Sequence, residues 1–411
     1  MKRTMRGWGK LTVVVLMVSV LLTSCSLLPT NVADVAENSL SVGDSVTITR
    51  EEYEKLQRYE ELNEILDIID TYYYQEPDED VLIEYAKRGM MAGLQDQYSF
   101  YYNPQEYAEL WADDEGKYAG VGIQIMASYE TGLCTISRIF TGSPAAEVGL
   151  HRGDVLRKVE DVDVTAATLN DAVDIMRGEA SKSVHVEVER GTEVLSFDIP
   201  RAQITVNWVN SMMLDGDVGY IALYDFSGDC SLQFQTQLDA LVKQGAKGLV
   251  LDLRDNPGGW VDDAVKIADI FLPKGVVTYF ENRAGEREYY YATDGQLDLP
   301  LVVLINENSA SASEILTGAL KDYGVATVVG TVSYGKGVVQ YVLPVGKDGA
   351  GVQLTAAQYF TPKGNAVHHV GITPDVEQAL PEGDNGMYEM GDLADVQLAT
   401  AVETLRGLMA K

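Results

Sequence analysis

Two apolar runs, "GLVLDLRDNPGG" at 248–259 and "LPLVVLINENSA" at 299–310, constrain the fold most tightly. Each is typical of a strand buried on both faces that ends in a Gly-rich or polar turn. Helical patterns follow both runs, at 261–272 and 312–323. Strands that alternate with helices require crossover connections, which favour a largely parallel sheet. We therefore expect an α/β unit over residues 202–380.

The rest of the chain predicts further units in its 411 residues. Apolar residues at helical spacing predict a small helical region at 50–111. Short alternating strands and two short helices predict a β-rich domain at 113–201. An acidic segment and one more helix follow at 381–411. The predicted fold class is α+β and multidomain: a helical N-terminal unit, a β-rich domain, and an α/β core with strand-helix-strand crossovers.

The N-terminus predicts export. Lys and Arg residues precede a short apolar run at 11–22, and small residues lead directly to Cys25. This pattern resembles a bacterial lipoprotein signal at 1–25, with Cys25 lipidated, followed by a tether at 26–49. An uncleaved anchor and a plain secretory signal remain the alternatives, and all three place the rest of the chain outside the cytoplasm.

Composition excludes one class of partner. The net charge of −31 argues against nucleic acid, which would need a basic surface. Cys134 and Cys230 have no CxxC partner and no metal-ligand neighbourhood, so we interpret them as buried small apolar residues, with a bond between them left open. The sequence calls for no cofactor: the chemistry inferred below needs neither a metal nor a nucleotide.

The stretch "SASASE" places three serines on alternate positions, Ser309, Ser311 and Ser313. Ser311 begins an S-x-x-E capping box at the start of a predicted helix. On local pattern alone a capping role is favoured. However, a helix start also gathers N–H groups that stabilise an oxyanion, so a capping role and a nucleophilic role for Ser311 are compatible.

A nucleophilic serine needs a base. "YGKGVVQ" places Lys336 between two glycines, after the strand that follows the Ser311 helix, and burial would lower the pKa of such a lysine. Gln340, four residues on, could orient the amine. His368 and His369 are the imidazole alternatives, although no orienting acid motif accompanies them. An ordinary loop lysine remains the structural alternative.

The Gly258-Gly259 turn follows a strand at its carboxyl end, where ligands bind in open α/β sheets. Its N–H groups, with that of Ala312, could form an oxyanion hole. The structural alternative is a tight turn that simply requires glycine.

Together, "LDLRDNPGG", "SASASEI", "YGKGVVQ", "YFTPKG" and "GITPDV" resemble the C-terminal processing peptidases, the tail-specific serine proteases. The likeness covers about residues 60–380. The resemblance implies that Ser311 is the nucleophile, Lys336 the general base and Gln340 its orienting residue. It implies an oxyanion hole built from Gly258 or Gly259 together with Ala312.

Residues 113–201 resemble a PDZ domain through "YAGVGIQI" and "GSPAAEVGLHRGDVL". The resemblance implies that Gly120, Val121, Gly122 and Ile123 bind a peptide carboxylate while the peptide adds as a strand. Arg177, in "MRG", matches a segment that couples peptide binding to the active site in some relatives. "GLQDQYSFY" at 93–101 lacks the Pro and His of the family's usual "LDPHSxY", and we expect no part in the chemistry for it.

The sequence thus predicts an extracytoplasmic, membrane-anchored serine endopeptidase that cleaves exported proteins near their C-termini. Its expected partners are substrate tails and, through the lipid anchor, a membrane. Its expected location is the outer side of the cytoplasmic membrane or the periplasm. A homodimer is implied by resemblance only. The alternative is a lipoprotein that binds peptide tails or apolar ligands on the same fold without cleaving them.

Overall fold

The computed structural model describes residues 47–128, 131–214, 216–293, 295–384 and 386–411. The chain divides into two compact units, Met1–Leu82 and Ile83–Lys411. The predicted signal segment with Cys25, and the tether up to residue 46, lie outside the described residues. None of the helices in the described ranges has the length and apolar character needed to cross a membrane.

The described part of the N-terminal unit, from residue 47 onward, is helical and contains α3 (Arg50–Gln57) and α4 (Glu60–Tyr72). Thr49 begins α3 with a capping box: its hydroxyl accepts from the N–H of Glu52, whose carboxylate accepts from the N–H of Thr49. Neither helix contains a buried residue, and apolar side chains along α4 such as Leu62 and Ile65 are exposed. The helix α5 (Glu79–Ala92) crosses the boundary between the units.

A β-rich domain is built around one antiparallel sheet in the order β3-β4-β5-β7-β8, with β6 paired to β5. Its apolar core includes Ile136, Leu156 and Val186, and α7 and α8 cover it. The separate pair β2-β9 joins the start of this domain to its end. The helix α6 (Pro104–Asp114) precedes this domain, whose elements are β2 (Lys117–Gly120), β3 (Ile123–Ala127), β4 (Cys134–Ile139), α7 (Pro144–Val148), β5 (Val155–Val159), β6 (Val162–Asp163), α8 (Leu169–Met176), β7 (Ser183–Arg190), β8 (Glu193–Pro200) and β9 (Ala202–Thr205).

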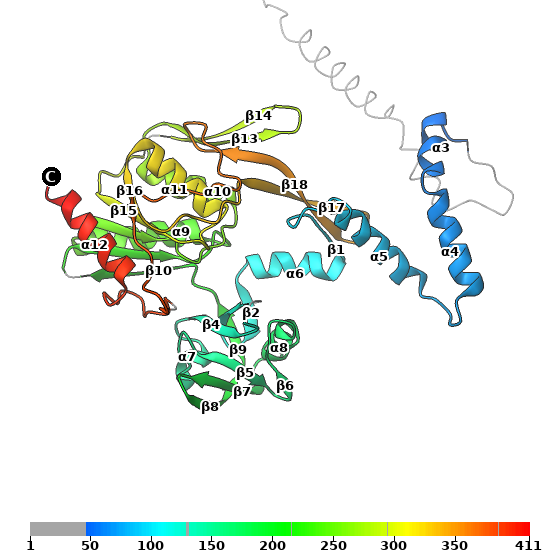
Figure 1. Cartoon of the computed structure of the whole chain (residues 1–411), viewed down its shortest axis with the longest axis horizontal. Helices are drawn as coiled ribbons and strands as arrows, with labels where there is room; N and C mark the ends of the chain where they lie inside the picture. The colour runs from blue at the N-terminus through cyan, green and yellow to red at the C-terminus, as the bar shows by residue number, and fades with distance from the viewer. Residues whose placement is uncertain (1–46, 129–130, 215, 294, 385) are drawn as a thin grey trace, which may run out of the picture. The chain divides into compact units, whose positions relative to one another are not determined.

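The central sheet of the core follows the order β10-β11-β12-β15-β16-β19 (Figure 1). Only the edge pair β10-β11 is antiparallel, so the predicted largely parallel sheet is confirmed. The carboxyl ends of β12 and β15 lie side by side, since Asp252 pairs with Leu304. The strands are β10 (Val209–Leu214), β11 (Val218–Leu223), β12 (Gly248–Asp252), β15 (Leu301–Ile305), β16 (Ala326–Gly330) and β19 (Val376–Glu377).

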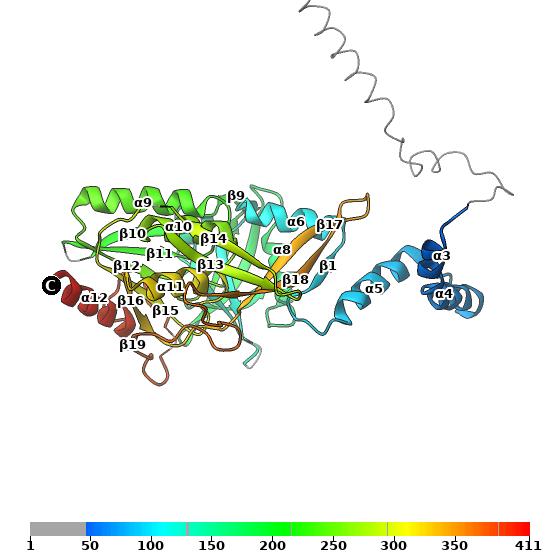
Figure 2. The same cartoon turned by 90° about the horizontal axis from the view of Figure 1, so that it is seen from above.

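Helices cover both faces of this sheet. One apolar core unites one face with α9 (Cys230–Gln244), α10 (Val261–Phe271) and α11 (Ala312–Tyr323). A second, around Val250 and Val302, packs against α12 (Val396–Met409), the C-terminal helix drawn in red in Figure 2. The buried strands thus read as continuous apolar runs because both faces are covered. Cys134 and Cys230 are both buried and free.

A second, antiparallel sheet carries the segment that contains Lys336. It runs β1-β18-β13-β14, and β17 also pairs with β18. Lys336 lies two residues before β17. The strands are β1 (Phe100–Tyr102), β13 (Gly275–Asn282), β14 (Arg287–Ala292), β17 (Val338–Val345) and β18 (Ala350–Phe360).

Candidate active site

The serine triplet follows the carboxyl end of β15, and Ser311 is the N-cap of α11. Ser311 is 8% exposed and has φ 55°, a left-handed conformation that is costly for a residue with a side chain. Such strain persists only where surrounding contacts enforce it, and it is concentrated at functional sites.

The other two serines fasten this loop to the turn after β12. The Ser309 hydroxyl donates to the carbonyl oxygen of Leu253 (2.7 Å), and the Ser313 hydroxyl donates to that of Asn256 (3.0 Å). Both side chains are fully buried. Their hydroxyls therefore hold the loop and the turn together.

The glycine turn packs directly against Ser311. A Cβ at Gly258, where φ is 110°, would lie 2.7 Å from the Cβ of Ser311, so only glycine fits. The N–H of Gly258 donates to Oδ1 of Asn256 (2.9 Å). By contrast, the N–H groups of Gly259 and Ala312 donate to no protein acceptor in the described ranges. These two groups are the donors left for an oxyanion.

Glu314 organises the start of α11. Its buried carboxylate accepts the N–H of Ser311 (2.9 Å), the carboxylate half of the predicted capping box. The hydroxyl half of the capping box is weaker. The Ser311 hydroxyl faces the N–H of Glu314, but this N–H donates its hydrogen bond to the Ser311 carbonyl oxygen (2.9 Å). The same carboxylate accepts the Ser333 hydroxyl (2.5 Å) and the N–H groups of Gly335 (2.7 Å) and Lys336 (2.9 Å). Burial raises the pKa of Glu314, and these hydrogen bonds oppose the rise.

This carboxylate brings the predicted nucleophile and base together. The main-chain nitrogens of Ser311 and Lys336 each lie 2.9 Å from the same oxygen, Oε2 of Glu314. They therefore lie no farther apart than twice that distance, although 25 positions separate them in the sequence. Burial lowers the pKa of Lys336, while the charges of Asp96 and Glu314 partly oppose that shift. Within the described part of the chain, no hydrogen bond joins the Ser311 hydroxyl to the Lys336 amine.

Gln340 lies on β17, where a bulge separates it from Val339. Its side-chain Nε2 donates to Oγ1 of Thr355 on β18 (3.1 Å). In this structure the amide is therefore engaged with Thr355.

The two histidines lie close to Lys336. The N–H of His369 donates to the carbonyl oxygen of Gly335 (2.8 Å), and the rings of His368 and His369 have centroids 3.8 Å apart. Burial and then His369 lower the pKa of His368, so its ring is neutral at neutral pH. Gly337 is required here, because a Cβ would lie 2.1 Å from the nitrogen of His368.

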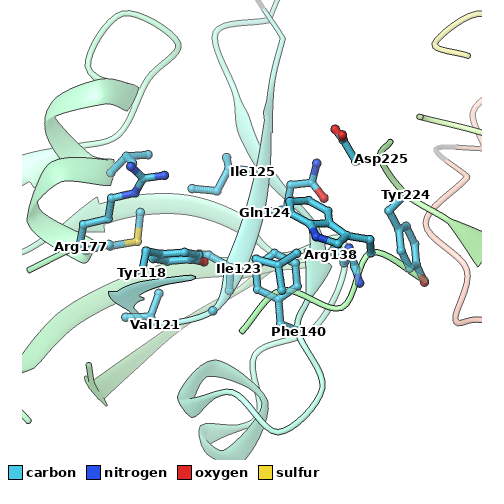
Figure 3. Close-up of a pocket in the computed structure, with 15 residues that line it drawn as sticks. Tyr118, Val121, Ile123, Gln124, Ile125, Arg138, Phe140, Arg177, Tyr224 and Asp225 are labelled. Carbon is cyan, nitrogen blue, oxygen red and sulfur yellow. The ribbon is translucent and has the colours of Figure 1, made fainter. Parts of the chain in front are cut away.

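In the β-rich domain, the four predicted peptide-binding residues form the loop from β2 to β3. The carbonyl oxygens of Val121 and Gly122 accept from Ala145 and Phe140 (both 3.0 Å), which fixes the loop against α7. A pocket of about 280 Å³ opens beside it, lined by Val121, Gly122 and Ile123. Figure 3 shows Arg177 beside Tyr118 at one end of this pocket, with Arg177 5.2 Å from the Tyr118 ring centroid. Gly120 lies just before the pocket, paired with Ala202.

A second cavity, of about 1010 Å³, adjoins this pocket. Lys336 and Ala310 line it from the core, and His151 and Arg152 line it from the β-rich domain. The two cavities share five lining residues: Gln124, Ile125, Arg138, Phe140 and Tyr224. The peptide pocket and the catalytic loop thus open onto neighbouring space.

Three family models match the chain: "Peptidase family S41" over residues 217–378, "PDZ domain" over 135–190 and "Activating protease CtpB N-terminal domain" over 28–106. A carboxyl-terminal-processing protease of a Synechocystis species is 38% identical over 330 residues, 78% of this chain and 76% of that protein. The chain belongs to peptidase family S41. A carboxy-terminal-processing protease from Bartonella bacilliformis is 36% identical over 84% of this chain and 81% of that protein.

A solved structure of a C-terminal processing protease has a similar architecture. The photosystem II D1 C-terminal processing protease superposes with a TM-score of 0.57 at 29% identity, over 85% of this chain and 97% of that one. The multidomain α+β fold and the PDZ domain are thereby confirmed, and the chain is a peptidase.

Sequence reasoning missed two features of this peptidase's site. The S-x-x-E motif predicts only a helix cap for Glu314, whereas its carboxylate also binds the Lys336 segment. Tyr98, in the "GLQDQYSFY" segment, lies with its ring centroid 4.7 Å from Nζ of Lys336. The capping-box motif indicates part of the role of Glu314. For Tyr98, the sequence offers only the departure of its segment from the family motif.

Proposed function

We propose that this peptidase is a serine endopeptidase with a Ser311-Lys336 dyad that cleaves exported proteins near their C-termini. The observation that carries this proposal is the single Glu314 oxygen that accepts the N–H groups of both residues. Burial lowers the pKa of Lys336, so a larger neutral fraction is present at a given pH than for an exposed lysine.

The proposed reaction needs only groups of this chain and water. Neutral Lys336 takes the proton of the Ser311 hydroxyl while Oγ attacks the scissile carbonyl carbon. The N–H groups of Gly259 and Ala312 stabilise the oxyanion, and Gly258 permits its close approach to Ser311. The lysine then protonates the leaving amine, and water hydrolyses the acyl-enzyme with Lys336 again as base. Gln340 would orient the amine once substrate is bound.

The PDZ domain supplies the tail-binding step. We propose that Gly120, Val121, Gly122 and Ile123 hold the substrate's C-terminal carboxylate, with the tail added as a strand to β3. The adjoining cavities support this route, since they share five lining residues and Lys336 lines the larger one. Arg177, at the end of α8, is the proposed link between tail binding and catalysis.

The proposal also includes export and lipidation at Cys25. It places the enzyme on the outer side of the cytoplasmic membrane or in the periplasm, as a homodimer. The exposed apolar side chains of α3 and α4 support the dimer, because two amphipathic helices without buried residues gain stability from a partner.

Replacing the serines tests the proposal. With an unfolded substrate that has an apolar C-terminus, Ser311→Ala should lose cleavage by a factor of about 1000 or more and keep its fold. Ser211→Ala is the matched control, because it removes a hydrogen-bonded hydroxyl of the same domain outside the Ser311 loop and should keep cleavage. Wild-type cleavage by Ser311→Ala would contradict the dyad, and binding without cleavage by the wild type would favour the non-catalytic alternative.

A further inference from the structure

The segment Gln95–Ser99 lies beside Lys336, although 238 positions separate Tyr98 from it. The Tyr98 ring centroid is 4.7 Å from Nζ of Lys336, and both residues line the larger cavity. Burial and the neighbouring Tyr334 raise the pKa of Tyr98 to about 12, so its phenol is neutral at physiological pH. The contact is therefore one between an ammonium group and the face of a neutral ring, which stabilises the charged amine.

Asp96 supplies a negative charge to the same place. Burial opposes its ionisation, but hydrogen bonds from Ser99 and Thr355 and from the N–H of Tyr98, together with the charge of Lys336, hold the pKa of Asp96 below its usual range. The geometry is well defined: Oδ2 accepts the Ser99 hydroxyl (2.5 Å) and Oδ1 accepts the N–H of Tyr98 (3.1 Å). The carboxylate is thus fixed and ionised near the amine.

Gln340 is connected to this arrangement. Its amide donates to the Thr355 hydroxyl, which also bonds to Asp96. The N–H of Thr355 in turn donates to Ser99 (3.1 Å). A residue predicted to orient Lys336 is therefore linked, in this structure, to the carboxylate beside that lysine.

We propose that Asp96 and Tyr98 form a resting site for the ammonium group of Lys336, which they hold protonated and out of hydrogen-bonding contact with Ser311 until substrate binds. This inference rests on the proposed Ser311-Lys336 dyad. Asp96 and Tyr98 are positioning residues, since they act on the base and not on the substrate. To become a base, Lys336 must leave this site and lose a proton to solvent before it accepts the proton of Ser311.

Other titratable groups also lie around Lys336. Glu314 binds its main chain, Tyr334 precedes it in the same loop, and His368 and His369 pack on the flanking glycines. Two of them interact with the substituted residues: Tyr334 with Tyr98, and His368 with the charge of Asp96. Asp96→Asn lowers the pKa of His368 further, which leaves that ring neutral at neutral pH. Tyr98→Phe removes the phenol but keeps the ring, so a shift seen in Tyr98→Leu and absent from Tyr98→Phe is assigned to the ring beside Lys336.

The test is the pH dependence of kcat/KM, which reports the pKa of the base in the free enzyme. The full chain would be assayed on a peptide with an apolar C-terminus as wild type, Tyr98→Leu, Tyr98→Phe and Asp96→Asn. Tyr98→Leu removes the ring and should move the acid limb to lower pH by about half a unit to one unit. Asp96→Asn removes the charge and should move it in the same direction by about one unit. Tyr98→Phe keeps the ring and should not move it.

The resting site would be overturned if the acid limbs of Tyr98→Leu and Asp96→Asn coincided with that of the wild type. It would also be overturned if the acid limb of Tyr98→Phe moved as far as that of Tyr98→Leu. Asp96→Asn decides the question alone if the leucine variant does not fold. Failure of the underlying dyad would look different, because Lys336→Met would then cleave like the wild type.

Discussion

Two buried polar networks in this peptidase differ in how completely they are satisfied. Around Glu314, four donors from two segments meet one carboxylate at 2.5–2.9 Å, and the Tyr359 hydroxyl approaches it at 3.4 Å. At the junction of the PDZ domain and the core, Arg138 and Arg152 each keep a buried Nε without a hydrogen-bond partner in the described structure.

The arginines nevertheless make the contacts that join the two domains. Arg152 donates from Nη1 to the carbonyl oxygen of Tyr388 (3.1 Å) and pairs through Nη2 with Asp255 at 3.6 Å. Arg138 donates to the carbonyl oxygen of Asn207, and its guanidinium lies 3.5 Å from the ring centroid of Tyr224. Burial lowers the pKa of Arg138 to about 10.

The contrast indicates where the molecule can change shape. A saturated network has nothing to gain by rearrangement, so it fixes the start of α11 against the Lys336 segment. The Arg152–Asp255 ion pair at the domain junction is long and partly exposed, so it holds the junction less firmly. We infer that the Ser311 loop is preorganised and that the PDZ junction is the adjustable part.

Glu314→Gln should break the saturated network with the largest effect. The substitution places an NH2 group among donors that need an acceptor. We expect the free energy of unfolding to fall by about 3 kcal/mol or more, and cleavage to fall with it. Denaturant unfolding and cleavage assays measure both. Glu307→Gln, whose exposed carboxylate accepts only from Thr331 (2.9 Å), should change stability by less than about 0.5 kcal/mol. Equal effects of the two substitutions would contradict preorganisation by Glu314.

Gly258→Ala should affect cleavage next most strongly. The new Cβ would meet Ser311, the carbonyl oxygen of Ala310 and the nitrogen of Ala312 at 2.7–2.9 Å, so the nucleophile must shift. We expect kcat/KM to fall by about 100-fold. Gly245→Ala is the control: its φ of 102° imposes a similar backbone strain, but a Cβ there meets nothing within 4 Å. Cleavage should survive in that variant, and its loss would show that backbone strain alone explains the effect.

Arg152→Ala should have the smallest effect on stability, under about 1 kcal/mol, because the ion pair is partly exposed and long. It should instead loosen the junction, and amides of residues 386–391 should exchange hydrogen faster. Arg157→Ala removes a bridge to Glu189 within the PDZ domain and should leave those amides unchanged. Unchanged hydrogen exchange of these amides in Arg152→Ala would contradict the inference that the domain junction is the adjustable part.

The sequence predicted the parts of the site that are encoded locally. The helix predicted at 312–323 is α11 with the same bounds, and the capping box placed Glu314 beside Ser311. A local signal says nothing about partners brought in by folding, which is why the Ser333, Gly335 and Lys336 contacts of Glu314 went unforeseen. The contact of Tyr98 with Lys336 depends on the pairing of β1 with β18. The contact of Arg152 with Tyr388 depends on the docking of two domains.

The reaction of the enzyme with a serine-directed fluorophosphonate tests the central claim most directly. The modified residue would be identified by mass spectrometry, and the rate followed against pH in the wild type and in Lys336→Met. We expect modification at Ser311. The rate should rise with pH through a midpoint below 10.5, because burial lowers the pKa of Lys336 and only the neutral amine accepts the proton. Lys336→Met should react far more slowly at every pH. Modification elsewhere, or reaction of Ser311 at the wild-type rate in Lys336→Met, would contradict the dyad.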